Sequence, residues 1–105
     1  MAAGLTLQVL SDPSRQAILE LLREGEQPVG ELVEHLDLSQ PAVSKHLRVL
    51  KEAGLVEARP AGQQRLYRIR PEPLVELDQW LAPYRRLWMT HLDRLEDHLD
   101  RRRHE

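Results

Sequence analysis

The sequence predicts a mainly α-helical domain of about five helices with one small β-hairpin. Two patterns predict this fold class. Apolar side chains recur every three or four residues along most of the chain, which is the period of an amphipathic helix. Between Gly54 and Pro71 the pattern changes to the alternation that is typical of strands. The length of 105 residues, of which 41% are hydrophobic, fits one domain with a modest core.

Two short helices are expected first. Residues 5–11 form a short apolar segment that we interpret as a helix. A second helix begins at Ser11-Asp12-Pro13, because Asp12 or Ser11 can cap it and Pro13 fits a first helical turn. Gly25 ends this second helix. Its apolar face consists of Ile18, Leu19, Leu21 and Leu22.

Two further helices are expected over residues 28–37 and 39–53, joined by a turn of only one or two residues. Gln27-Pro28 opens the first of them, and Ser39 caps the second, which has Pro41 in its first turn. So short a turn makes the two helices cross steeply and leaves the second one protruding. The buried stripe of the second helix is Val43, Leu47 and Leu50.

A hairpin and a long helix complete the chain. Residues 55–59 and 64–70 are the expected strands, with residues 60–63 as their turn. The long helix spans residues 71–103, and Pro83 is expected to kink or break it near residues 79–83. Apolar side chains follow this helix at steps of three or four, close to a heptad period. They are Leu74, Leu77, Leu81, Tyr84, Trp88, Leu92, Leu95 and Leu99.

Charge is unevenly distributed along the chain. The formal net charge is −2, but residues 1–37 carry −5, residues 38–70 carry +5 and residues 71–105 carry −2. A basic central third indicates a polyanionic partner, although a mixed-charge solvated surface would give the same total.

The composition excludes several functional classes. The chain has no cysteine, so it has no disulfide, no thiol nucleophile and no thiolate metal site. No apolar run reaches the length of a membrane span, and the N-terminus lacks the basic start of a signal peptide. Ser44 and His46 have no third partner that would complete a hydrolase triad. We therefore expect a cytoplasmic protein that is not an enzyme and uses no cofactor.

The order of elements is that of a winged helix-turn-helix. Its protruding helix can enter the DNA major groove, where glutamine pairs with adenine and lysine or arginine pairs with guanine or phosphate. The exposed face of residues 39–53 offers Gln40, Ser44, Lys45 and Arg48. The hairpin tip offers side chains suited to the DNA backbone or minor groove. They are Arg59, Gln63, Gln64 and Arg65.

Two stretches resemble the ArsR family of bacterial winged-helix repressors. Residues 31–69 read ELVEHLDLSQPAVSKHLRVLKEAGLVEARPAGQQRLYRI, and residues 10–22 read LSDPSRQAILELL. The resemblance covers about residues 5–70, which we expect to form the DNA-binding core of a single domain over residues 1–105. It implies recognition-helix contacts by Ser39, Gln40, Ser44 and Lys45, and wing contacts by Gln64 and Arg65.

The resemblance also implies a homodimer, because the family pairs through its first and last helices. Residues 71–103 would then be a dimerisation helix, and their apolar seam would lie in a two-fold interface. The expected interface residues are Leu5, Leu7, Leu81, Tyr84, Trp88, Leu92, Leu95 and Leu99. Trp80, Tyr84 and Trp88 follow one another at steps of four, and we interpret them as interface core rather than as an effector pocket.

Many members of the family sense metals, some with histidine and aspartate on the last helix. His91 and His98 are two turns apart, about 10 Å along the axis, so they could share an ion only across a dimer. We expect no metal site and interpret these histidines as solvated or interface residues. The polar candidates on this helix are Asp78, His91, Asp93, Asp97, His98, Asp100 and His104.

The sequence therefore predicts a homodimeric, sequence-specific repressor of transcription that binds double-stranded DNA at its own promoter. Two recognition helices would enter successive major grooves, about 34 Å apart, on an inverted repeat. Two alternatives remain at this stage. One is a metal-responsive repressor that uses last-helix histidine and aspartate. The other is a winged helix that binds proteins and no DNA, against which the basic central third argues.

Overall fold

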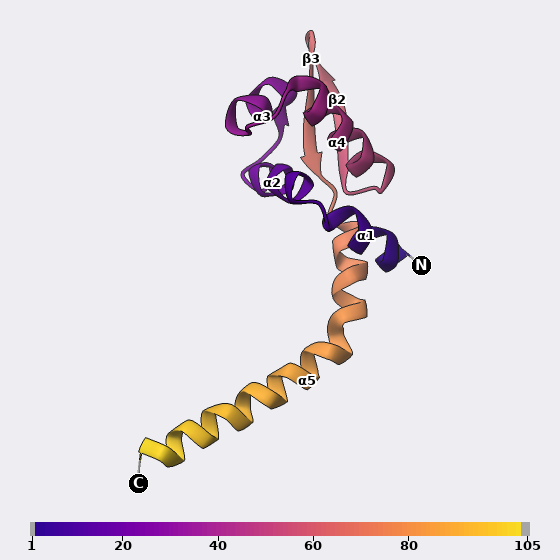
Figure 1. The fold of residues 1–105 in the computed structure, drawn as a ribbon. Coiled ribbons are helices and arrows are strands. Elements are labelled where there is room, and N and C mark those ends of the chain that lie inside the picture. The colour runs from indigo at the N-terminus through magenta and orange to yellow at the C-terminus, as the bar shows by residue number, and fades with distance from the viewer. Residues whose placement is uncertain (1, 104–105) are drawn as a thin grey trace.

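The computed structural model describes residues 2–103 and confirms the predicted fold class (Figure 1). Within that range it has five helices and a three-stranded antiparallel sheet. The elements are α1 (Ala2–Leu10), α2 (Pro13–Leu22), β1 (Gln27–Pro28), α3 (Val29–His35), α4 (Gln40–Glu52), β2 (Val56–Ala61), β3 (Gln64–Ile69) and α5 (Glu72–Arg103). In the same range, no helix has the length and apolar character that a membrane crossing needs.

Polar caps fix the starts of α2 and α4. Asp12 accepts hydrogen bonds from the backbone N–H groups of Ser14 and Arg15, at 2.8 and 3.1 Å, and Pro13 occupies the first turn. Ser39 accepts a longer hydrogen bond from the N–H of Ala42, at 3.3 Å. Each cap satisfies backbone donors that have no partner inside the helix.

The prediction for Gln27 and Pro28 was wrong. They do not open a helix but form strand β1, which pairs with β3 so that Gln27 lies opposite Tyr67 and Pro28 opposite Leu66. The sheet therefore has three strands in the order β1-β3-β2 rather than two. α3 begins one residue later, at Val29. A strand of two residues is too short to show an alternating pattern, so the sequence carried no sign of it.

Other boundaries also shift. The first helix begins at Ala2 rather than at residue 5, and four residues, 36–39, separate α3 from α4. In the hairpin, β2 continues through Pro60 to Ala61, and only Gly62 and Gln63 remain as the loop. Gly62 has a φ of +64°, a conformation that glycine adopts at low cost. Pro60, which has no N–H to donate, is tolerated because β2 is an outer strand.

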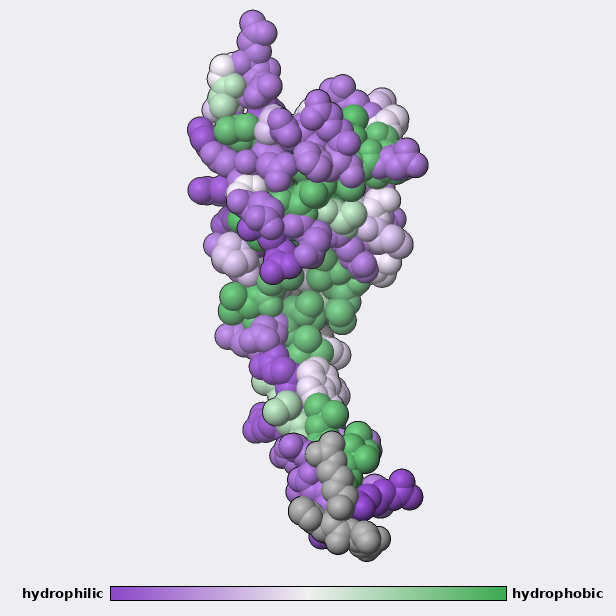
Figure 2. Space-filling model, turned by 90° about the vertical axis from the view of Figure 1, so that its left-hand side faces the viewer, coloured by the Kyte–Doolittle hydropathy of each residue, from purple (hydrophilic) through white to green (hydrophobic). Residues whose placement is uncertain are grey.

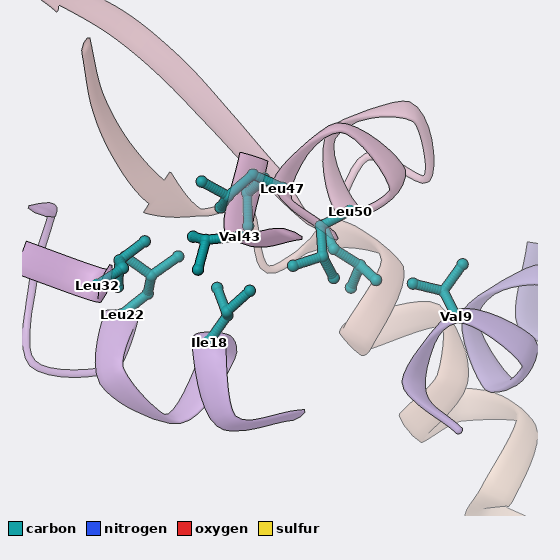
Figure 3. Packing of buried hydrophobic residues seen from close by; sticks show 9 residues of the cluster. Val9, Ile18, Leu22, Leu32, Val43, Leu47 and Leu50 are labelled. Atoms are coloured by element: carbon teal, nitrogen blue, oxygen red, sulfur yellow. The ribbon is translucent and has the colours of Figure 1, made fainter. Parts of the chain in front are cut away.

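One aliphatic core joins these elements (Figure 3). Side chains from α2, α3 and α4 point toward one another, and Val9 adds α1 to the cluster. Tyr67 and Ile69 on β3 pack against the same cluster, so one face of the sheet covers it. The fully buried members are Ile18, Leu32, Val43, Leu47, Leu50, Leu55 and Val56. The predicted apolar stripe of α4 packs in this core, and the opposite face of α4 remains exposed to solvent.

α5 is one continuous helix of 32 residues that leaves the body and bends (Figure 1). Pro83 lies inside it and removes one backbone donor. Across the bend, the Arg85 guanidinium donates to the Asp78 backbone oxygen, at 2.9 Å, and pairs with the Asp78 carboxylate. The helix is thus kinked near the predicted place and is not broken.

Candidate nucleic-acid interface

The exposed face of α4 carries the polar side chains predicted to read DNA. Its N-terminus is capped by Ser39 and stiffened by Pro41 in the first turn. Val43, Leu47 and Leu50 anchor the opposite face in the core with no exposed surface. The side chains predicted for DNA contact on this element are all exposed, and they are Ser39, Gln40, Ser44, Lys45 and Arg48. The core therefore fixes α4 rigidly while this polar face stays open to a ligand.

His46 is turned inward rather than toward this face. Its side chain is half-buried, and its Nδ1 atom is buried without a hydrogen-bond partner in the described structure. It lies close enough to Asp12 for its positive form to lower the pKa of that carboxyl. The main cause of the lowered Asp12 pKa is the hydrogen bond from the Arg15 backbone. His46 therefore lies where α4 packs on the start of α2.

A groove of about 300 Å³ lies between the start of α4 and the tip of the hairpin. Gln40 from α4 and Arg65 from β3 line it together, so the structure brings these two predicted residues to one place. Pro28, Val29 and Gly30, where β1 leads into α3, also line it. The wing residues on its lining are Gln63, Gln64, Arg65 and Tyr67. The groove thus combines apolar surface with the hydrogen-bonding groups of its glutamines and Arg65.

Ion pairs divide the cations of the basic central third into two sets. Arg59 is held by Glu26, Arg68 by Glu57, and Arg70 lies 3.7 Å from Glu57 and 3.6 Å from Glu72. Four cations have no acidic partner within 4 Å among the described residues, and they are Lys45, Arg48, Lys51 and Arg65. Three of these four lie on α4, so the available positive charge gathers on that helix and on the wing side that faces the groove.

Two of these findings were missed from the sequence. Lys51 is an exposed, unpaired cation in the last turn of α4, three residues after Arg48, and that spacing alone could have indicated it. Glu26 is separated from Arg59 by 33 residues, so no local pattern indicated their pairing. Of the two wing arginines predicted to contact DNA, only Arg65 is free of an ion pair in the described structure.

A second surface, on α1 and α5, is apolar and exposed. Every described side chain from Arg86 to Arg102 is exposed, although the apolar seam continues through this stretch. Figure 2 shows hydrophobic side chains gathered where α5 leaves the body and again farther along it. The exposed large apolar residues are Leu5, Leu7, Val75, Trp80, Tyr84, Leu87, Trp88, Met89, Leu92, Leu95 and Leu99. Leu81, also predicted for the interface, is half-buried.

Within residues 2–103, no group of three or more histidine, aspartate or glutamate side chains is placed to hold one metal ion. His91 and His98 are both exposed on the same helix, as their spacing indicated. His104 lies outside the described residues. The single chain thus offers no assembled set of ligands in the part that the structure describes.

Comparison with known proteins gives a consistent match. Residues 12–58 match the family model described as "Bacterial regulatory protein, arsR family". A transcriptional regulator of Mycobacterium tuberculosis, Rv2034, is 51% identical over 70 residues, which is 67% of this chain and 65% of that protein. The chain therefore spans less than two thirds of the length of this relative. The transcriptional repressor SdpR of Bacillus subtilis is 34% identical over 73% of this chain and 86% of its own.

A solved structure agrees with the sequence matches. The crystal structure of an ArsR family transcriptional regulator superposes with a TM-score of 0.74 at 31% identity. The superposition covers 85% of this chain and 92% of the other. It therefore includes more than the segment that the family model matches. These similar proteins are named as regulators of transcription, which agrees with the expectation that the chain is not an enzyme.

Proposed function

The chain belongs to the ArsR family of bacterial regulatory proteins, and we propose that it is a homodimeric transcriptional repressor that binds double-stranded DNA in the cytoplasm. The observation that carries the proposal is the exposed face of α4. It combines unpaired cations with glutamine and serine at the end of the helix that lies beside the wing. Cations supply affinity for phosphates, and glutamine and serine supply the contacts that distinguish bases.

We assign a role to each residue of this surface. Gln40, Ser44 and Lys45 reach base edges in the major groove, and Ser39 and Arg48 contact the flanking backbone. Gln64 and Arg65 contact the backbone from the wing side of the groove. Residues 5–70 form the DNA-binding core in this proposal, and residues 71–103 form the dimerisation helix.

The dimer rests on the apolar surface of α1 and α5. Trp88, Leu92, Leu95 and Leu99 are each about half exposed on a helix segment that packs on nothing in the single chain. An isolated helix of this kind is marginal in water, and packing of its apolar face supplies most of its stability. A second copy related by a two-fold axis covers the seam with the same residues. It also brings a second α4 to the other half of an inverted repeat.

The proposal is tested by titrating the purified protein onto its own upstream DNA and onto a scrambled duplex of equal length. Fluorescence anisotropy at two salt concentrations separates specific from electrostatic binding, because phosphate contacts weaken steeply with salt. Tighter binding to the upstream duplex that persists at the higher salt supports autoregulation. Equal and salt-sensitive binding to both duplexes contradicts it.

Two substitutions on α4 make the test residue-specific. Gln40→Ala removes a base contact, so affinity for the preferred duplex is expected to fall by roughly 5- to 150-fold with an unchanged salt slope. Lys45→Ala removes a second base contact, so affinity for the preferred duplex is expected to fall by a similar factor. Glu52→Gln, at the far end of the same helix, is the control. Unchanged binding in both variants would rule out α4 as the reading helix.

A further inference from the structure

The strand register sorts the wing side chains onto two faces of the sheet. In the pairing of β2 with β3, Arg59 lies opposite Leu66 and Glu57 opposite Arg68. Side chains alternate along a strand, so these four residues share one face. Tyr67 and Ile69 occupy the other face, which packs on the core. Arg59 therefore lies on the outer face of the sheet, whereas Arg65 has the same register parity as Tyr67 and lies on the opposite face.

Glu26 closes an ion pair across this outer face. The Nε atom of Arg59 donates to both carboxylate oxygens of Glu26, at 3.2 and 2.9 Å, and Nη2 donates to Oε1 as well. Glu26 directly precedes β1, and Arg59 lies on β2, so the pair joins the two outer strands across β3. Leu66, which lies opposite both Arg59 and Pro28, is half-buried.

The backbone before β1 sets the position of Glu26. Gly25 has a φ of +137°, which side chains with a Cβ rarely adopt, and it ends the turn that follows α2. The hydrogen bond from Arg59 holds the pKa of the Glu26 carboxyl below its ordinary value, against a smaller opposing effect of burial, and the nearby Arg68 lowers it further. Glu26 is therefore fully ionised at neutral pH and remains a partner for Arg59.

Arg65 has the opposite surroundings. It is exposed, it has no acidic partner among the described residues, and it lines the groove that also contains Gln40 of α4. The two wing arginines are six residues apart in the sequence, yet only one of them is available to a phosphate beside the recognition helix.

We propose, on the basis of the DNA-binding function above, that Glu26 is a positioning residue that withholds Arg59 from DNA and ties the wing to the start of β1. Arg65 is then the wing's phosphate contact. The sheet presents its groove side to the duplex, and its outer face is neutralised by Glu26 and Glu57.

The test is a salt titration of the full chain on its upstream duplex and on a duplex of random sequence. Arg59→Gln is expected to leave the slope of log K against log salt unchanged, whereas Arg65→Gln makes it shallower by about 0.9 for each subunit of the bound dimer, on both duplexes. Glu26→Gln releases Arg59, so the slope becomes steeper by up to about 0.9 for each subunit of the bound dimer. This steepening disappears in the double variant Glu26→Gln/Arg59→Gln.

Glu20→Gln is the matched control, because it makes the same charge change and frees Arg23 at the end of α2 instead of Arg59 on β2. The proposal is overturned if Arg59→Gln alone makes the slope shallower, since Arg59 would then contact a phosphate. It is also overturned if Glu26→Gln gives the same slope as Glu20→Gln. Both results require a wild-type chain that binds DNA. A wild type that binds neither duplex refutes the proposed function itself.

Discussion

At the scale of single residues, Asp12 and Arg15 link α1 to α2. The Asp12 carboxylate caps α2 and accepts a hydrogen bond from the Arg15 backbone N–H. The Arg15 side chain in turn donates from Nε to the Val9 backbone oxygen of α1, at 2.7 Å. The sequence offered Ser11 and Asp12 as equivalent caps. The structure distinguishes them because the Ser11 hydroxyl instead donates to the Gln8 oxygen, at 2.6 Å, and so completes the end of α1. Local chemistry permits both arrangements, and the packing of α1 on α2 selects one.

This cap predicts how stability depends on pH. The pKa of Asp12 is lowered in the folded chain, chiefly by the hydrogen bond from the Arg15 backbone. A carboxyl of this kind contributes stability above its unfolded pKa, and the contribution is lost as the pH falls from about 4 through the folded value. Asp12→Asn keeps a good cap without the titrating group. The variant should therefore lose less stability than wild type between pH 7 and pH 3.

Urea unfolding at the two pH values measures this difference. Glu24→Gln is the control, because Glu24 is exposed and its side chain makes no hydrogen bond in the described structure. If Asp12→Asn and wild type lost equal stability over this range, the cap would not be the source of the acid sensitivity.

At the scale of elements, periodic helices were predictable and short pairings were not. The apolar steps of α4 indicated both its buried stripe and its exposed face, because a helix of fixed period cannot bury one without exposing the other. Strand β1 has only two residues, and its proline favours the prediction of a helix start, because proline is also common in a first helical turn. The partner of Arg59 could not be predicted, because it depends on how β1 and β2 lie in the sheet.

The bend in α5 gives an element-scale prediction. Pro83→Ala restores a backbone donor, and alanine is favoured over proline in a helix interior by up to about 3 kcal/mol. We expect a higher thermal midpoint and an unchanged dimer, but weaker DNA binding, because a straighter α5 changes how the two bodies are oriented. Calorimetry, small-angle scattering and anisotropy measure these three properties. DNA affinity equal to that of wild type would mean that the bend does not set this orientation.

At the scale of the whole molecule, the two surfaces lie at opposite ends. Figure 1 shows the hairpin at one end of the body and α5 extending from the other. The radius of gyration is 18.9 Å and the longest dimension is 67 Å, whereas a compact domain of this length has a radius of about 13 Å. The difference comes from the part of α5 that packs on nothing in the single chain. This extended shape supports the proposal that α5 pairs with a second copy of the chain.

Dimerisation gives the prediction at this scale. Leu95→Glu places a charge in the middle of the exposed seam, so a two-fold pair would bury two such charges. We expect monomers in sedimentation and loss of tight DNA binding. Thr90→Glu adds the same charge on the opposite side of α5 and is the control. A Leu95→Glu variant that sediments as wild type would exclude the seam as the interface.

The prolines in the sheet have a consequence for solubility. Both outer strands carry one, Pro28 in β1 and Pro60 in β2, and neither residue can donate a backbone hydrogen bond to an incoming strand. The edges of this sheet therefore resist the strand-by-strand pairing between copies that leads to fibrils and aggregates. A chain with this much exposed leucine and tryptophan depends on that protection during synthesis, when single copies have yet to meet. In the proposed dimer, self-association would then occur through the helices, where it ends at a closed pair.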